Sequence, residues 1–181
     1  MAKIIITADT LKAISPYVTT QRANVYASLL NGCMHEHGLS DNINRCAMFL
    51  AQVFHESGHL KYTEEIASGA KYEGRKDLGN TEPGDGKKYK GRGLLQITGR
   101  ANYREMAHML GLDLINHPAI LSTPVNAVMS ACLWWGKRAD RLNPLADAGN
   151  VVGVTKIING GTNGLSERVK LFERAMKVLQ K

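Results

Sequence analysis

The sequence predicts a mainly helical, single-domain protein with one long loop region in its first half. Apolar residues recur at three- and four-residue intervals through most of the 181 residues, which is the spacing of one face of an α-helix. Glycine and polar residues interrupt this pattern between 68 and 93, a composition typical of loops and short hairpins. No internal repeat or low-complexity linker divides the chain, so we expect one domain over residues 1–181.

The charge balance favours an anionic partner. The chain has a net charge of +7 and a sequence pI near 9.4, and its basic residues are spread rather than clustered in an arm. Such a balance suits nucleic acid, acidic lipid or bacterial cell wall. No nucleic-acid-binding motif is present and no apolar run reaches the ~18 residues of a membrane span. We therefore expect a monomer that neither binds nucleic acid nor inserts stably into a membrane.

The N-terminus and the cysteines indicate the compartment. The apolar run Ile4–Ile6 is only three residues long and Asp9 follows it, which is not the pattern of a secretory signal. Cys33, Cys46 and Cys132 are odd in number and widely spaced, so we expect reduced, buried thiols. The sequence thus predicts a cytoplasmic protein unless another factor releases it.

Capping residues delimit the first three predicted helices. Each helix begins after a Thr, Asp or Asn that can accept backbone N–H groups, and each ends at a Pro or Gly signal. In chain order the candidate caps are Thr7 or Asp9, Thr19 or Thr20, and Asp41 or Asn42. The corresponding stop signals are Ser15-Pro16, Gly38 and Gly58.

The third of these helices carries a glutamate on its apolar face. Val53, Phe49 and Cys46 precede Glu56 by three, seven and ten residues, so all four share one helical face. A carboxyl group there is partly withdrawn from water, which favours its protonated form. The alternative is a solvated glutamate near a helix C-terminus whose apolar neighbours face elsewhere.

Two more carboxylates follow the helix. Glu64 and Glu65 lie beyond the break at Gly58, on a more polar segment. One partly buried acid and one wetter acid on separate elements are what glycoside hydrolysis requires. The sequence around Glu56 therefore predicts half of an acid/base pair, with its partner among the two following glutamates.

The loop region and the segment after it have features of a polysaccharide cleft. Tyr72 and Tyr89 stand among basic residues that include Arg92, and sugar rings stack on aromatic faces. Beyond them, Gln96 and Thr98 alternate with apolar residues, which predicts a short strand with one polar face.

Four further helices are predicted in the second half of the chain. They cover 101–110, 124–135, 147–158 and 167–179, with Thr123-Pro124 opening the second and Ser166 capping the last. Trp134 and Trp135 lie on an apolar helix, so we expect them to pack in the core rather than to bind sugar. A glycine-rich loop with two amides, 159–164, separates the last two helices.

His55 and His59 raise a different possibility. With Glu56 they resemble the His-Glu-x-x-His pattern of zinc proteases. That pattern requires the helix to continue through Gly58 and a third ligand from elsewhere, so the sequence favours it less than the glycosidase interpretation. We expect no metal and no other cofactor.

Four segments together resemble glycoside hydrolase family 19, which holds plant and bacterial chitinases and phage endolysins. They are Phe54-His55-Glu56-Ser57-Gly58, Tyr62-Thr63-Glu64-Glu65, the block from Tyr89 to Tyr103, and Ile158-Asn159-Gly160-Gly161-Thr162-Asn163-Gly164. The similarity spans roughly residues 40–175 in family order, and the block around Gln96 is its most specific part. The overall length looks most like the compact phage or prophage endolysins.

This resemblance implies a lysozyme-like, mainly helical fold with two lobes about a cleft, and inverting hydrolysis of β-1,4 bonds next to N-acetylhexosamine. Glu56 matches the general acid, Glu65 the general base, and Thr98 the residue that helps to hold the attacking water. An inverting pair needs its carboxyl groups roughly 6.5–9.5 Å apart. The expected substrate-binding residues are His55, Tyr62, Tyr89, Arg92, Gln96, Asn102, Tyr103, Asn159 and Arg168.

Departures from the family bear on the substrate. Gly58-His59 stands where plant members have paired glycines after the acid, and the extended loops and disulfides of plant chitinases are missing. A shorter cleft favours bacterial peptidoglycan, so we expect an endolysin-type hydrolase that stays in the host cytoplasm until holin-type release to the periplasm and wall. The alternatives are a chitinase acting on chitin oligomers and, more distantly, a non-enzymatic basic wall-binding module.

Overall fold

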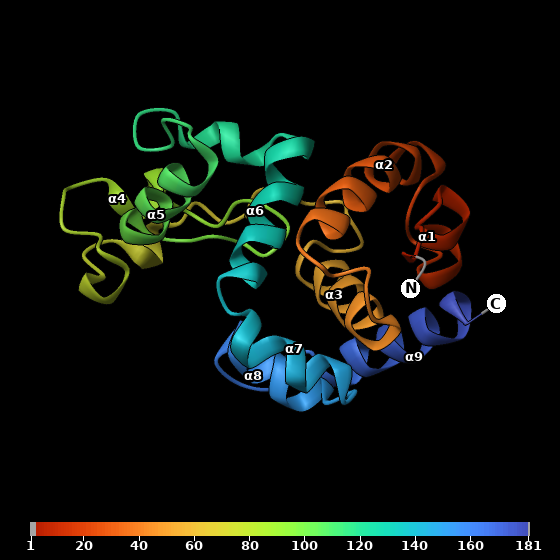
Figure 1. The fold of residues 1–181 in the computed structure, drawn as a ribbon. Helices are drawn as coiled ribbons and strands as arrows, with labels where there is room; N and C mark the ends of the chain where they lie inside the picture. Colours follow the sequence, from red (N-terminus) through yellow and green to blue (C-terminus); the bar gives the residue numbers. More distant parts are fainter. Residues whose placement is uncertain (1–2, 181) are drawn as a thin grey trace.

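A computed structural model describes residues 3–180, which form helices joined by loops (Figure 1). The α-helices are α1 (Ala8–Ile14), α2 (Thr20–Glu36), α3 (Ile43–Glu56), α4 (Asp85–Lys88), α5 (Arg100–Leu110), α6 (Pro124–Gly136), α7 (Ala139–Asp147), α8 (Val151–Asn159) and α9 (Leu165–Leu179). Three short 3₁₀ turns, η1 (Ala70–Tyr72), η2 (Lys76–Leu78) and η3 (Pro118–Ser122), lie in the loops. Extended pairing over these residues is limited to two isolated bridges, Glu64–Arg92 and Arg92–Ile97. The predicted mainly helical class is confirmed.

For each of the first three helices, the structure shows which of the two candidate residues is the N-cap. Thr7 accepts a hydrogen bond from the Thr10 N–H at the start of α1, and Thr19 accepts one from the Arg22 N–H at the start of α2. Asn42 caps α3 through the N–H groups of the next turn. These short-range contacts satisfy N–H groups that have no partner within the helix, which is why local sequence predicts them.

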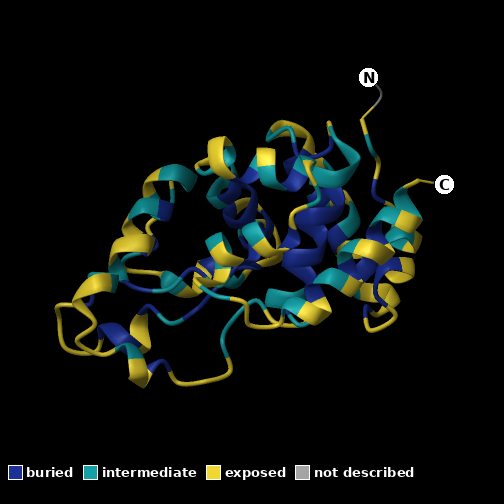
Figure 2. Ribbon diagram, turned by 90° about the horizontal axis from the view of Figure 1, so that it is seen from below, coloured by how far each residue is buried: buried dark blue, intermediate teal, exposed yellow. Residues whose placement is uncertain are grey.

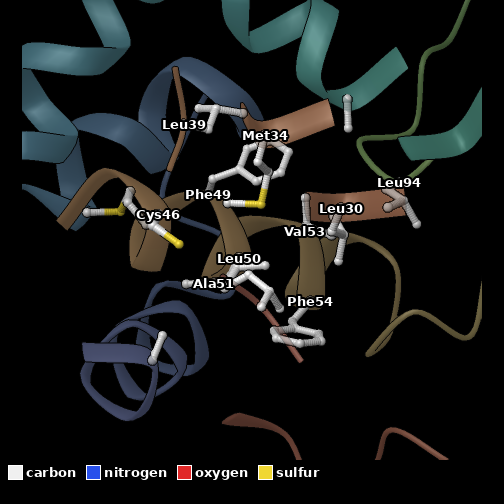
Figure 3. Packing of buried hydrophobic residues seen from close by; sticks show 14 of the residues in the cluster. Leu30, Met34, Leu39, Cys46, Phe49, Leu50, Ala51, Val53, Phe54 and Leu94 are labelled. Carbon is white, nitrogen blue, oxygen red and sulfur yellow. The ribbon is translucent and has the colours of Figure 1, made fainter. Parts of the chain in front are cut away.

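The helices form two lobes, and α3 is the centre of the larger one, which also contains α1, α2, α7, α8 and α9. Every residue from Cys46 to Phe54 is buried, so the helix is enclosed on all sides. Figure 2 shows this concentration of buried residues, and Figure 3 shows Phe49, Leu50 and Phe54 packed among side chains of neighbouring elements. Because α3 ends at Glu56, the core of the larger lobe fixes the position of that glutamate.

A second, smaller apolar cluster supports the other lobe. It joins α5 to the loops on either side of it through Tyr89, Ile97, Tyr103, Met106, Leu114 and Leu121. Helix α6 lies between α5 and the larger lobe in Figure 1, and its residue Trp134 packs against both clusters. Trp135 is fully buried in the larger cluster, as predicted.

Three predicted elements differ from the structure. The segment expected to be a strand contains Gln96 with a φ of 54°, a left-handed conformation that ends extended pairing. The helix expected over 147–158 is interrupted by Gly149, whose φ of 69° separates α7 from α8. The last helix begins at Leu165, after Gly164, rather than at a Ser166 cap.

The cysteines and the helix lengths agree with the expectations from composition. Cys33, Cys46 and Cys132 are buried free thiols, and burial raises the pKa of Cys46 to about 12. Within residues 3–180, no helix is both long enough and apolar enough to cross a membrane.

Candidate active site

Glu56 is held by a buried guanidinium. Arg168 is fully buried, and its Nη2 donates to the Glu56 Oε1 while its Nη1 donates to the Oε1 of Gln52, one turn earlier on α3. Its Nε donates to the Asn163 backbone carbonyl at 3.2 Å. Arg168, predicted to contact substrate, links the N-terminus of α9 to the carboxylate at the end of α3 in this structure.

The chain leaves α3 through a left-handed turn. Gly58, His59 and Leu60 have φ values of 54°, 62° and 62°, although two of the three are not glycine. The Ser57 hydroxyl donates to the Val53 carbonyl at 2.6 Å and accepts the Leu60 N–H at 2.8 Å, which stabilises the turn. Such conformations cost free energy and are frequent at functional sites.

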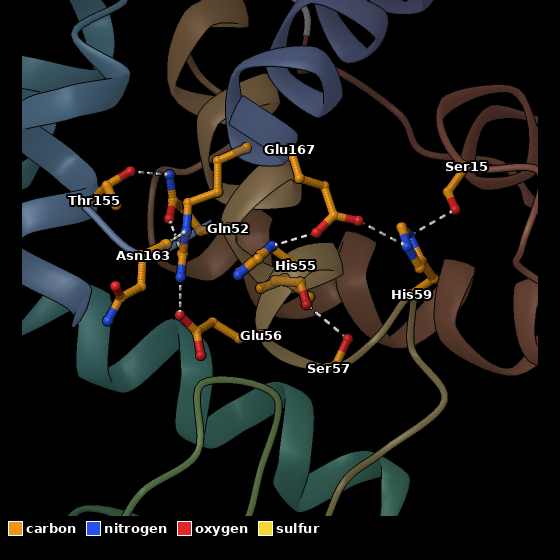
Figure 4. Close-up of polar contacts among 11 residues, drawn as sticks. Ser15, Gln52, His55, Glu56, Ser57, His59, Thr155, Asn163 and Glu167 are labelled. Atoms are coloured by element: carbon orange, nitrogen blue, oxygen red, sulfur yellow. Dashed lines mark hydrogen bonds and ion pairs between the residues drawn. The ribbon is translucent and has the colours of Figure 1, made fainter. Parts of the chain in front are cut away.

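The two histidines of this segment flank one carboxylate on α9. The Nδ1 of His55 lies 2.6 Å from the Glu167 Oε2, and the Nε2 of His59 lies 3.2 Å from its Oε1 (Figure 4). Helix α3 ends before His59, so the two imidazoles do not share a helical face as the zinc-protease pattern requires. His55, expected to contact substrate, is bound to Glu167.

Glu65 lies in a separate network on the loop side. Its Oε1 lies 2.9 Å from the Lys71 Nζ and accepts the Tyr72 hydroxyl at 3.2 Å, and its Oε2 accepts the Gly91 N–H at 3.3 Å. Burial raises the pKa of Glu65, but the Lys71, Gly91 and Tyr72 contacts outweigh burial and lower its pKa overall. Glu65 is therefore ionised at neutral pH, as a general base must be.

Three polar groups converge on Gly91. A Cβ atom at this glycine would lie 2.7 Å from the Gln96 Oε1 and 3.4 Å from both the Glu65 Oε2 and the Thr98 Oγ1. The Thr98 hydroxyl in turn donates to the Gln96 carbonyl at 2.9 Å. The candidate base, the candidate water-binding hydroxyl and an amide thus surround one point, where only a glycine leaves room.

Glu64 faces a different set of groups. Its Oε1 lies 2.9 Å from the Lys90 Nζ and 3.2 Å from the Arg92 Nη2, and its Oε2 accepts the Ser122 hydroxyl at 3.4 Å. Burial raises the pKa of Glu64, but these cations lower it overall. Glu64 forms ion pairs with cations of its own lobe, whereas Glu65 approaches Gly91, as Thr98 does.

Two tyrosines expected to bind sugar belong to the core of the smaller lobe. Tyr89 and Tyr103 are fully buried, and their hydroxyls donate to the carbonyls of Ile115 and Lys90 at 3.1 and 2.7 Å. Arg92 is also buried and donates to the Tyr103 oxygen at 2.9 Å. These three residues, predicted to bind substrate, contribute to the interior of the smaller lobe in this structure.

Other predicted residues line a hollow of about 260 Å³ between the lobes. Gln96, Thr98 and Asn102 form one wall, and Trp134 from α6 forms part of another. The Asn102 Nδ2 donates to the Thr98 carbonyl at 2.7 Å. Ile158 of α8 completes the lining, and the exposed Asn159 follows it directly.

Tyr62 is separate from this hollow. Its ring packs against Gly58, where an added Cβ would lie 2.9 Å from the Tyr62 Cδ2. It lines a different depression together with His59 and Lys61.

Sequence reasoning missed three residues of these networks. Gln52 stands four residues before Glu56, a spacing that places both on one helical face and could have identified it. Lys71 and Glu167 have no such local signal, because tertiary folding brings them to Glu65 and to the two histidines.

Comparisons with known proteins indicate the family of the chain. The sequence profile of the chitinase class I family, glycoside hydrolase family 19, matches residues 40–154. A glycosyl hydrolase family 19 domain-containing protein of Haemophilus influenzae is 33% identical over 166 residues, covering 83% of this chain and 78% of that protein. Endochitinase At2g43620 of Arabidopsis thaliana is 36% identical over 118 residues, which cover 65% of this chain but only 40% of the plant protein.

Solved structures show the same fold. Chitinase C from Streptomyces griseus superposes with a TM-score of 0.78 at 18% identity, covering 100% of this chain and 95% of that one. A class IV chitinase from Zea mays superposes with a TM-score of 0.62 at 22% identity, covering 97% and 82% of the two chains. The chain thus spans nearly all of the bacterial structure but less than half of the Arabidopsis endochitinase.

Proposed function

The chain belongs to glycoside hydrolase family 19, the chitinase class I family, and on this premise we propose that it is an endolysin-type hydrolase that cuts β-1,4 glycosidic bonds of bacterial peptidoglycan. The observation that carries the proposal is the convergence of Glu65, Thr98 and Gln96 on Gly91, in a fold that holds Glu56 at the end of its central helix. The net charge of +7 favours an anionic wall as the polymer.

Glu56 acts as the general acid. In its protonated form it donates to the glycosidic oxygen as the bond from the anomeric carbon to that oxygen breaks. Arg168 keeps the carboxyl group in one position relative to α3, so that the proton is delivered in a fixed direction.

Glu65 acts as the general base. It takes a proton from a water that attacks the anomeric carbon from the face opposite the leaving oxygen, so the configuration inverts. The Thr98 hydroxyl and the Gln96 amide oxygen lie near the Glu65 carboxylate and orient that water. The step uses only these side chains and water.

Chitin hydrolysis is the second candidate, and the names of the relatives favour it. The Arabidopsis and Streptomyces proteins are chitinases by name. Parallel digestion of soluble chitin oligomers and purified peptidoglycan separates the two, since the proposal requires faster turnover of peptidoglycan.

The decisive experiment is mass analysis of purified peptidoglycan after digestion. We expect wild-type protein to release fragments with a new reducing sugar end, whose identity tells which β-1,4 bond is cut, and Glu56→Gln to release none. Wall that stays intact with the wild type would rule out the proposal. In cells, we propose that the protein stays in the host cytoplasm until a holin-type pore admits it to the periplasm and wall.

A further inference from the structure

A second depression lies beside the turn that follows α3. Two adjoining hollows of about 560 and 500 Å³ share Tyr17, His59 and Glu167 in their lining, so they form one continuous surface feature. It shares no lining residue with the hollow that contains Gln96 and Thr98. We call it the basic hollow, after the cations around it: Arg22, Lys61, Lys170 and Arg174.

Three of these cations are free to bind a ligand. Lys61, Lys170 and Arg174 are exposed, and none of their side-chain nitrogens has a hydrogen-bond or ion-pair partner among residues 3–180. Arg22 is different, because its Nη1 donates to the His59 carbonyl at 2.9 Å and its Nη2 to the Tyr17 carbonyl at 3.2 Å. Arg22 therefore shapes the hollow, and the other three supply positive charge without an acidic partner among residues 3–180. The Lys61 Nζ also lies over the Tyr62 ring, 4.9 Å from its centroid.

Among the described residues that line it, Glu167 is the one carboxylate, and its oxygens already have partners. Both oxygens of Glu167 contact imidazoles, those of His55 and His59. Tyr17, whose side chain is 68% exposed, lies with its ring centroid 4.9 Å from that of His59 and adds an apolar surface. An aromatic floor with unpaired cations at the rim suits a short peptide that carries carboxylates.

Part of the basic hollow lies outside the region that the family profile matches, whereas His59 and Lys61 lie inside that region. Tyr17 and Arg22 precede the region matched by the family profile, 40–154, and Lys170 and Arg174 follow it. The basic hollow is nevertheless next to the catalytic acid, because Glu167 in its lining is adjacent in sequence to Arg168, which binds Glu56.

We propose that the basic hollow binds the carboxylate-bearing peptide stems of peptidoglycan while the glycan strand occupies the catalytic cleft. This inference rests on the proposed function and names the part of the substrate that chitin lacks. The three free cations contact the stem carboxylates, and Tyr17 packs against the peptide.

The test compares two polymers that share one glycan strand. In the triple variant Lys61→Gln/Lys170→Gln/Arg174→Gln, we expect cleavage of intact peptidoglycan at low salt to fall roughly tenfold, and cleavage of glycan stripped of its stems by an amidase to stay at the wild-type rate. The control Lys12→Gln/Arg104→Gln/Lys177→Gln removes the same charge from exposed positions outside the basic hollow, and should change neither rate. Equal losses in the two triple variants, or no loss in the first, overturn the inference.

A binding measurement tests the same site without turnover. Titrating a soluble stem tetrapeptide into isotope-labelled wild-type protein should shift the NMR signals of Lys61, Lys170 and Arg174, and the triple variant should show no shift in the remaining hollow residues. Shifts of equal size with inorganic phosphate, or none with the peptide, contradict the proposal. If the peptide binds here but wild-type protein cleaves no peptidoglycan, the proposed function fails and this inference stands.

Discussion

The two carboxylates of the candidate active site are held in different ways. Glu56 ends a helix in which every residue from Cys46 to Phe54 is buried, and its partner Arg168 is fully buried as well. Glu65 lies in the loop lobe, where one of its partners, Lys71, has a side chain that is 64% exposed. The core of the protein thus positions the candidate acid, whereas short polar contacts position the candidate base. Substitutions around Glu56 should affect stability and activity together, whereas those around Glu65 should affect activity much more than stability.

The largest effects are expected when the carboxylates themselves are neutralised. Glu56→Gln and Glu65→Gln should each lower turnover of peptidoglycan by roughly 10²–10⁴-fold, because each removes one proton transfer. Glu64→Gln is the matched control, and it should retain most activity because Glu64 pairs with Lys90 and Arg92 instead. Initial rates of reducing-end release measure all three. A greater loss in Glu64→Gln than in Glu65→Gln would transfer the role of base to Glu64.

Removing the buried guanidinium should destabilise the fold as well as the site. Arg168→Met leaves the carboxylate of Glu56 and the amide oxygen of Gln52 without their donor. Loss of one partner of a buried ion pair typically costs about 3–5 kcal/mol in the free energy of unfolding. Urea unfolding measures this cost.

Lys71→Met is the corresponding substitution in the network around Glu65, and its loss of stability is to be compared with that of Arg168→Met. It removes a largely exposed ion pair and should cost about 0.2–1 kcal/mol. Similar losses of stability in Arg168→Met and Lys71→Met would show that the two networks are not held differently.

A single methyl group at Gly91 should separate activity from stability. In Gly91→Ala the new Cβ would lie 2.7 Å from the Gln96 Oε1, so the Gln96 amide must move away from its position beside Glu65 and Thr98. Misplacement of catalytic groups by up to 1 Å costs up to about 10²-fold, and we expect a loss of about tenfold in turnover. The φ of Gly91 is not positive, so the backbone accepts alanine.

Gly32→Ala is the control for that substitution. Gly32 lies within α2 with no atom within 4 Å of an added Cβ. Alanine there should leave activity unchanged and stabilise the helix by about 0.5–1 kcal/mol. If Gly91→Ala is as active as Gly32→Ala, the groups around Gly91 do not need their present spacing.

The contrast between the core that holds Glu56 and the loop contacts that hold Glu65 also explains which features the sequence could predict. The start and end of α3 depend on Asn42 and on apolar spacing, which are local features, so the helix and the position of Glu56 at its end were predicted correctly. In the loop lobe the predicted strand was wrong, because the left-handed Gln96 and the bridges to Arg92 depend on contacts between distant segments. The burial of Tyr89 and Tyr103 was not predicted for a related reason, because the second apolar cluster is assembled from segments that are separate in the sequence.

The smallest expected effect is a change in the pH dependence of activity. In the folded protein burial raises the pKa of Glu65, but Lys71 and the other contacts lower it overall. This carboxylate therefore stabilises the fold above its usual pKa, and that contribution is lost as the pH falls through its lowered pKa. Lys71→Met should raise the pKa of Glu65 and move the acidic limb of the kcat/KM profile to higher pH, with less change at neutral pH.

Lys76→Met is the control, because Lys76 is exposed in the same loop and has no contact with Glu65. Its pH profile should coincide with that of the wild type. If the acidic limb is the same in Lys71→Met as in Lys76→Met, the group that titrates there is not Glu65. The base would then have to be a carboxylate outside the Lys71 network, and Glu64, with its separate partners Lys90 and Arg92, is the next to test.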